Sequence, residues 1–219
     1  MPRLTENIWN NQIHYNQAKN NKLRIADLIE WTVNDLEIWE KTVFREMKNW
    51  ELVEYKWLKN FIHIKNPNQS IYIFDNHNHA LKYWLEEYKL WNTQFWFNLI
   101  HIDQHTDMNE SEFALNLENP KFDIYNVWNF IQPAIKSWLI SNVEQIKTEY
   151  KLLNFHTTED NLVLDIDLDF RAPEMSIEKY SETIEKTKEL ISKSRVVTIA
   201  TSPYFLDQEL AIKVCKELI

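Results

Sequence analysis

Glycine is absent from this chain of 219 residues, although an average globular chain of this length contains roughly 15 glycines. Phosphate-binding loops and the dinucleotide-binding turn of Rossmann folds need glycine where the backbone approaches a phosphate closely. The absence therefore excludes both kinds of nucleotide site. Asparagine tolerates left-handed backbone angles, so we expect it to replace glycine in some turns.

Cysteine, long apolar runs and positive charge are also scarce. Cys215 is the single cysteine, so no internal disulfide can form. The chain has no run of about 18 apolar residues and no apolar signal segment at its polar N-terminus, so we expect a cytoplasmic protein without a membrane partner. Its 24 lysines and arginines are outnumbered by 33 aspartates and glutamates. The net charge of −9 argues against nucleic acid as a partner and favours a cationic substrate. The sequence leaves a homo-oligomer open.

The residues that are present have the pattern of an α/β protein. Hydrophobic residues make up 44% of the chain, which is enough for one core, and we expect a single domain over residues 1–219. Apolar spacing in residues 24–44 predicts a helical N-terminal arm over residues 1–60. Further along, short β-rich runs alternate with helical segments, which predicts a mainly parallel sheet with helices on both faces.

Three apolar strands end in acidic and imidazole side chains at every second position. The triplets are Asp75, His77 and His79; Asp103, His105 and Asp107; and Asp165, Asp167 and Asp169. Side chains alternate along a strand, so each triplet is expected to project to one side. Because the carboxyl ends of parallel strands form the ligand crevice of such sheets, the three triplets are expected to converge.

Carboxylates gathered at one point need cations, because like charges raise one another's pKa and lose hydration. Aspartate and histidine without thiolates suit hard or borderline divalent ions, and four or more carboxylates exceed the needs of one tetrahedral zinc. We therefore expect two Mn²⁺ ions per chain. Such a pair activates water against an electrophilic carbon, which indicates metal-assisted hydrolysis.

Simpler interpretations explain these residues less well. A lone aspartate at a strand end usually caps a turn or helix, and a lone histidine is usually structural, but three alternating triplets are unusual in either role. The segment "DIDLDF" lacks the glycine of an EF-hand loop and has Ser176 where the bidentate glutamate belongs. An acid-nucleophile phosphatase strand is a further alternative, although no other phosphate-handling motif accompanies it.

The segments "IYIFDNHNHAL", "HIDQHTDM", "NFIQPAI" and "LDIDLDF" occur in this order. Residues 103–109 resemble the D-A-H-T-D-I-N segment of arginases and their ureohydrolase relatives. The whole set is similar to the small arginase-like branch of the arginase/deacetylase superfamily, which includes peptide arginases of ribosomal peptide pathways. The resemblance covers residues 71–203 and implies a three-layer α/β/α fold with a binuclear manganese site in a core over residues 71–205.

Carried over by position, the resemblance implies six metal ligands. They are His77, Asp103, His105, Asp107, Asp167 and Asp169. Asp107 also matches the carboxylate that holds the attacking hydroxide. Spacing alone leaves two choices open, namely His79 in place of His77 and Asp165 in place of Asp169.

Other side chains are expected to complete the site. His79 shares a face with His77 and is the expected proton shuttle, whereas His101 lies deeper in its strand, where a structural role is expected. Asn109 matches the arginase asparagine that contacts the amino-acid end of the substrate. Asn129, which opens "NFIQPAI", is expected to line the same mouth.

Two positions depart from the arginase pattern. Arginases follow their final strand with a glutamate that binds the guanidinium, but Ala200 stands there in this chain. Asp207, Glu209 or an acid of the N-terminal arm would have to replace it. The Gly-Gly before the first ligand histidine is also missing, with Asp75 and Asn76 in its place, so that loop must differ locally.

These observations favour one function and leave two alternatives. The first is conversion of arginine side chains to ornithine and urea, in a ribosomally made precursor peptide, by a binuclear manganese hydrolase. The alternatives are a deacetylase-like amide hydrolase, which the missing glutamate favours, and a non-catalytic metal-binding or peptide-binding module.

Three tryptophans of the N-terminal arm are expected to pack in the core, with contact to a peptide as the alternative. They are Trp31, Trp39 and Trp50.

Overall fold

Short runs of branched and aromatic residues form one seven-stranded sheet, as their β-propensity favours. In spatial order its strands are β1 (Leu28–Glu30), β4 (Phe61–Asn66), β5 (Gln69–Phe74), β9 (Val196–Ala200), β8 (Leu162–Asp167), β6 (Phe97–Ile102) and β7 (Ile140–Ile146). Only β4 and β5 pair antiparallel among these strands. The computed structural model describes residues 26–42, 44–48, 50–90, 97–120, 122, 125, 127–158 and 162–219. For this part of the chain, the predicted mainly parallel sheet is confirmed.

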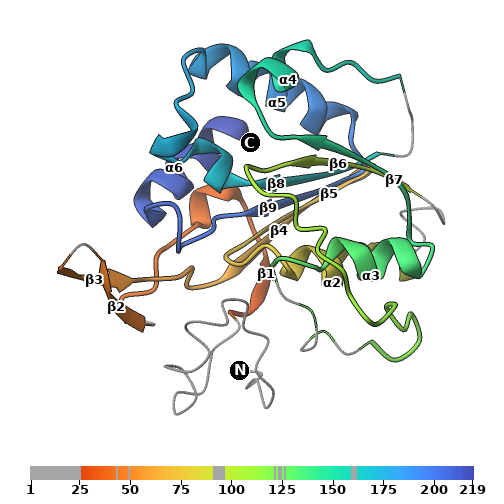
Figure 1. Ribbon diagram of the computed structural model, residues 1–219, viewed down its shortest axis with the longest axis horizontal. Coiled ribbons are helices and arrows are strands. Elements are labelled where there is room, and N and C mark those ends of the chain that lie inside the picture. The colour runs from red at the N-terminus through yellow and green to blue at the C-terminus, as the bar shows by residue number, and fades with distance from the viewer. Residues whose placement is uncertain are drawn as a thin grey trace.

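Helices cover both faces of the sheet and complete three layers (Figure 1). One face carries α2 (His79–Lys89) and α3 (Ile131–Lys136), and the other carries α4 (Glu149–Asn154), α5 (Tyr180–Lys193) and α6 (Gln208–Leu218). The short 3-10 helices are η1 (Val33–Asp35), η3 (Leu168–Arg171) and η4 (Pro173–Met175). None of the described helices has both the length and the apolar character needed to cross a membrane.

The two central strands are buried along their whole length. Every residue of β8 and β9 is buried, because helices cover both of their faces. Burying each of their branched side chains contributes about 1.5–3 kcal/mol, so this part of the sheet is a rigid base for the polar residues at its edge. The single cysteine, Cys215 of α6, is also buried, and this burial raises the pKa of its thiol to about 12.

The described part of the N-terminal arm contains no α-helix and only one short 3-10 helix. Residues 26–60 contain β1, η1 and a two-stranded hairpin of β2 (Phe44–Lys48) and β3 (Glu51–Tyr55). The predicted helix over residues 24–44 is therefore wrong in its described part, because pairing of β1 with β4 overrides the local helical spacing. Residues 1–25 of the predicted arm lie outside the described residues. Trp31 and Trp50 are 57% and 96% exposed, so their predicted packing in the core is also wrong.

Five described residues have the left-handed backbone angles that usually select glycine. They are Trp50 (φ 69°), Asp107 (φ 50°), Trp138 (φ 61°), Ser176 (φ 48°) and Ser202 (φ 43°). Asparagine, which we expected at such positions, occupies none of these five. A left-handed residue other than glycine costs roughly 1–2 kcal/mol, and such strain often gathers at functional sites. Asp107 and Ser202 both follow strands at the edge of the sheet where the polar residues gather.

Candidate metal centre

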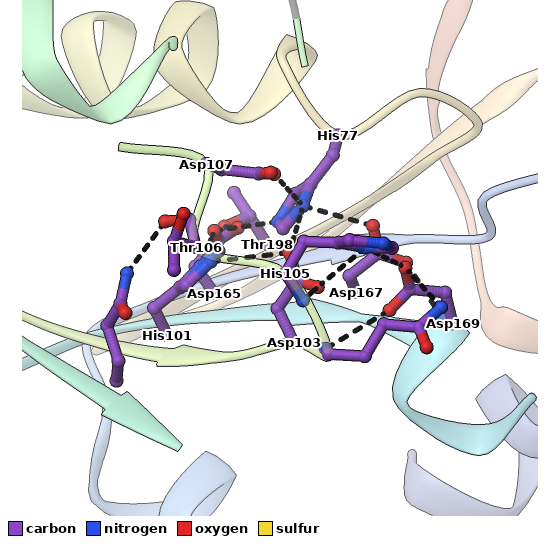
Figure 2. Close-up of polar contacts among 12 residues, drawn as sticks. His77, His101, Asp103, His105, Thr106, Asp107, Asp165, Asp167, Asp169 and Thr198 are labelled. Atoms are coloured by element: carbon purple, nitrogen blue, oxygen red, sulfur yellow. Dashed lines mark hydrogen bonds and ion pairs between the residues drawn. The ribbon is translucent and has the colours of Figure 1, made fainter. Parts of the chain in front are cut away.

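The polar ends of β5, β6 and β8 meet at one edge of the sheet, and Figure 2 shows their side chains pointing toward one another. The registers explain this convergence. In the parallel pairs, His101 of β6 lies opposite Asp165 of β8, and Asp167 of β8 lies opposite Ala200 of β9. Because β5 flanks β9 on the other side, His77 comes from the end of β5 into the same space. The structure thus brings His77 of the first triplet to the same place as the other two triplets.

A first group of possible metal ligands surrounds Nδ1 of His77. This nitrogen lies 3.2 Å from Oδ2 of Asp103 and 3.0 Å from Oδ2 of Asp107. Oδ2 of Asp167 lies 3.1 Å from it. Among the described residues, neither His77 Nδ1 nor Asp103 Oδ2 has a hydrogen-bond partner, although both atoms are buried. Buried polar atoms without partners are costly, and a cation between them would satisfy both.

A second group surrounds Nδ1 of His105. This nitrogen lies 2.8 Å from Oδ2 of Asp169 and 3.5 Å from Oδ1 of Asp103. The side chain of Gln104 donates a hydrogen bond of 3.1 Å to Asp169 Oδ2. Asp103 therefore belongs to both groups and turns a different oxygen toward each of them. Either group could hold a metal ion.

All six predicted ligands lie in this cluster. Asp167 joins the two groups, because its Oδ2 faces His77 while its Oδ1 accepts a hydrogen bond of 2.8 Å from the backbone N–H of Asp169. The donor set is carboxylate and imidazole without thiolate, which suits hard or borderline divalent ions such as Mn²⁺. The residues present therefore fit the metal that the sequence led us to expect.

Asp165 lies on the other side of His77 from these groups. Its Oδ2 lies 2.8 Å from Nε2 of His77 and 2.9 Å from Nδ1 of His101. Its Oδ1 accepts a hydrogen bond of 2.6 Å from the hydroxyl of Thr198, which in turn accepts one of 3.2 Å from the indole of Trp84. The three residues His77, His101 and Asp165 form a third group of metal-ligand type. Since both oxygens of Asp165 already have protein partners, the geometry favours a role in orienting the His77 ring, as carboxylates do behind metal-bound histidines.

Removing the negative charge of Asp165, which contacts Nε2 of His77, is expected to weaken metal binding. Asp165→Asn should lower the affinity for Mn²⁺ about 10- to 100-fold, because an amide can no longer accept from both His77 and Thr198 while holding the ring. Isothermal titration with Mn²⁺ measures the effect. The exposed Glu182→Gln change on α5 serves as the control that should keep the original affinity. An Asp165→Asn protein that folds normally and binds Mn²⁺ as tightly as the original would argue against this orienting role.

The crowding of charge in the cluster shifts several pKa values. Burial, helped by the charge of Asp167, raises the pKa of Asp169 to about 8, and burial likewise raises that of Asp107 to about 6. Hydrogen bonds to Asp103 and Asp169 raise the pKa of His105 to about 10. Burial opposes protonation of His77, but the charges of Asp165 and Asp167 outweigh it and hold its pKa well above the usual value. Without a cation the cluster thus retains protons, and a bound divalent cation would displace them.

A small cavity of about 60 Å³ opens onto this centre. Its lining residues are Asn76, His77, His105, Asp107, Val127, Trp128, Asp167, Ser202, Tyr204 and Phe205. The His105 side chain is 45% exposed, so the cluster can be reached from outside. Among the described residues, Asp107 and Asp167 are the only carboxylates in the lining. Asp207 and Glu209, considered above as guanidinium partners, line a different and larger cavity.

Three predicted site residues, namely His79, Asn109 and Asn129, lie outside both the metal-ligand groups and the lining of the small cavity. His79 opens α2, with its Nε2 3.4 Å from Oδ1 of Asp75 and its ring packed on Phe61 and Phe74. Because β5 ends at Phe74 and the chain then turns, His77 and His79 do not share a face as the strand spacing suggested. Of these two histidines, His77 is thus the one that joins the metal-ligand groups.

Asn109 and Asn129 are also absent from the lining of this cavity. The backbone N–H of Asn109 donates a hydrogen bond of 2.9 Å to the carbonyl of Trp128, and Trp128 itself lines the cavity. Sequence patterns carry no signal for four residues of the lining, because all four lie in irregular segments without periodicity; they are Trp128, Ser202, Tyr204 and Phe205.

Comparison of the chain with protein-family models, curated proteins and solved structures found no match. The function must therefore be inferred from the residues of the site.

Proposed function

We propose that this chain is an arginase-like hydrolase that holds two Mn²⁺ ions and converts arginine side chains of a peptide to ornithine and urea. One observation carries the proposal: Asp103 is shared between two groups, each of which contains one histidine and one further aspartate. The resemblance of residues 71–203 to the arginase/deacetylase superfamily supports the same conclusion from the sequence.

The charge of the site supports the number of ions. The carboxylates in and between the two groups are those of Asp103, Asp107, Asp167 and Asp169. Two divalent cations would neutralise these side chains without requiring any of them to be protonated. One cation would leave excess negative charge in a buried place, which is costly.

When bound, such a pair of cations supplies Lewis acidity and lowers the pKa of water. The chain's own residues then orient the substrate and exchange protons with it and with water. Asp107 lines the small cavity, and in the proposed reaction its carboxylate would accept a proton from water and return it to the leaving nitrogen of ornithine. His105 forms another wall of the cavity, held by Asp169 at its Nδ1. One water is consumed for each guanidinium, and the products are one amine and one urea.

The test is direct detection of both products. Mn²⁺-loaded protein is incubated with an arginine-containing peptide. Urea is then assayed, and the mass of the peptide is measured by mass spectrometry. We expect urea, and a peptide whose mass is lower by the difference between arginine and ornithine. The same peptide with lysine in place of arginine is the control. Full metal occupancy with no urea from either the peptide or free arginine would refute the proposal.

A second candidate is an amide hydrolase acting on acylated lysine. It is favoured by the lining of the small cavity, where the described residues offer no carboxylate for a guanidinium besides Asp107 and Asp167. The same incubation with an acetyl-lysine peptide distinguishes the two, because acetate would replace urea as the product. A protein that binds metal and releases neither product would be a binding module.

A further inference from the structure

A second, larger cavity of about 560 Å³ lies beside the small one. Its walls are residues 38–40, residues 53–56 at the end of β3, and residues 203–209 leading into α6. We call it the aromatic groove. Its volume falls in the range of about 300–1,000 Å³ that is usual for sites of organic ligands. Figure 1 shows the β2–β3 hairpin projecting from the sheet on the side where α6 lies.

The aromatic groove adjoins the small cavity at the metal centre. Tyr204 and Phe205 line both cavities. The ring of Phe205 lies 5.1 Å from that of His105, and Tyr204 lies 5.0 Å from Phe205 in an edge-on arrangement. Tyr204 also stacks on Tyr55 of β3, with ring centroids 5.5 Å apart. A row of rings thus leads from the cluster into the groove, so a chain lying in the groove could pass one side chain over Phe205 to the metal centre.

The aromatic groove is also acidic. Its lining includes the carboxylates of Glu40, Glu54, Asp207 and Glu209, against one cation, Lys56. Asp207 is occupied in capping α6, where it accepts from two backbone N–H groups, and Glu54 accepts from the hydroxyl of Thr42. The exposed carboxylates of Glu40 and Glu209 make no hydrogen bond or ion pair with any described residue. Carboxylates beside aromatic rings attract ammonium and guanidinium groups.

We propose that the aromatic groove binds the residues that flank the reacting side chain, and that it selects peptides with lysine or arginine beside the target. This inference rests on the proposed function, because it treats the metal centre as the place of reaction. The small cavity is too narrow for more than the end of one side chain, so the remainder of a peptide has to lie outside it. The aromatic groove is the adjoining space, with a charge complementary to a basic segment.

The test uses a probe that cannot react. A short fluorescein-labelled peptide of alternating lysine and alanine, without arginine, is titrated with Mn²⁺-loaded protein, and binding is followed by fluorescence anisotropy. We expect Glu40→Gln combined with Glu209→Gln to weaken binding about 5- to 20-fold, because two exposed charge contacts are lost. Glu182→Gln combined with Glu185→Gln changes the net charge equally on α5 and should leave binding unaltered. A peptide with glutamate in place of lysine should not bind.

Three results would overturn the inference. They are absence of binding to the original protein, unchanged binding by the groove variant, and an equal loss in the α5 variant, which would show attraction to overall charge alone. Tyr204→Ala gives an independent check, because it shortens the row of rings without changing charge and should also weaken binding.

The inference and the proposed function can fail separately. Binding that depends on Glu40 and Glu209, without urea from arginine peptides, would refute the arginase activity and leave a site for basic peptides. Urea release, together with binding by the groove variant as tight as that of the original protein, would support the activity. It would refute the inference that the groove binds basic peptides.

Discussion

Replacing Asp103 by asparagine is expected to lower urea release at least about 1,000-fold, as removal of a central catalytic group commonly does. Asp103 is the side chain shared by both metal-ligand groups, and it turns one oxygen toward His77 and the other toward His105. Asparagine keeps the shape of the side chain but removes its charge and one of its two oxygens. Both ions should therefore be lost or weakly held, which elemental analysis of the purified protein measures alongside the rate.

Asp75→Asn is the matched control for this experiment. Asp75 is also a buried aspartate that follows a strand of the same sheet, but it pairs with His79 and Asn76 rather than with the cluster. We expect this variant to retain its metal and most of its activity. An Asp103→Asn protein that keeps two ions and its original rate would show that the shared carboxylate does not hold the centre together.

Removal of the metal is expected to lower the midpoint of thermal unfolding by about 8–16 °C. A ligand present at about 1,000 times its dissociation constant stabilises the folded state by about 4 kcal/mol, and each kcal/mol shifts the midpoint by about 2–4 °C in a domain of this size. The cluster explains why the folded state alone should bind: its ligands come from β5, β6 and β8, which lie together only in the folded sheet.

Scanning calorimetry of chelator-treated protein, before and after return of Mn²⁺, measures this shift. The Asp103→Asn variant provides the control, since Mn²⁺ should leave its midpoint almost unchanged. Identical midpoints for the treated and reloaded original protein would mean that the cluster does not take up Mn²⁺.

The sequence was most informative where strands end. Alternation along β6 and β8 fixes which side chains share a face, and the parallel order of the strands then brings Asp103 and Asp167 to the same edge. It was misleading at His79, where the alternation was extended past the last residue of β5 into a turn. Periodicity has no meaning once the backbone leaves the strand.

Long-range pairing limits what local patterns can predict. The described part of the N-terminal arm has helical spacing, yet β1 is held by three pairs of residues shared with β4, and such pairing is invisible to a local window. The aromatic groove was equally unpredictable. Its walls come from Ile38, β3 and the segment before α6, which are far apart in the sequence and carry no common motif.

The buried thiol of Cys215 makes the chain its own reporter of transient opening. Thiolate is the form that reacts with alkylating reagents, and a pKa raised to about 12 leaves almost none of it at neutral pH while α6 stays packed. Alkylation of Cys215 is therefore expected only while α6 is detached from the sheet. Because the chain has no second thiol, the rate of alkylation measures how often α6 opens.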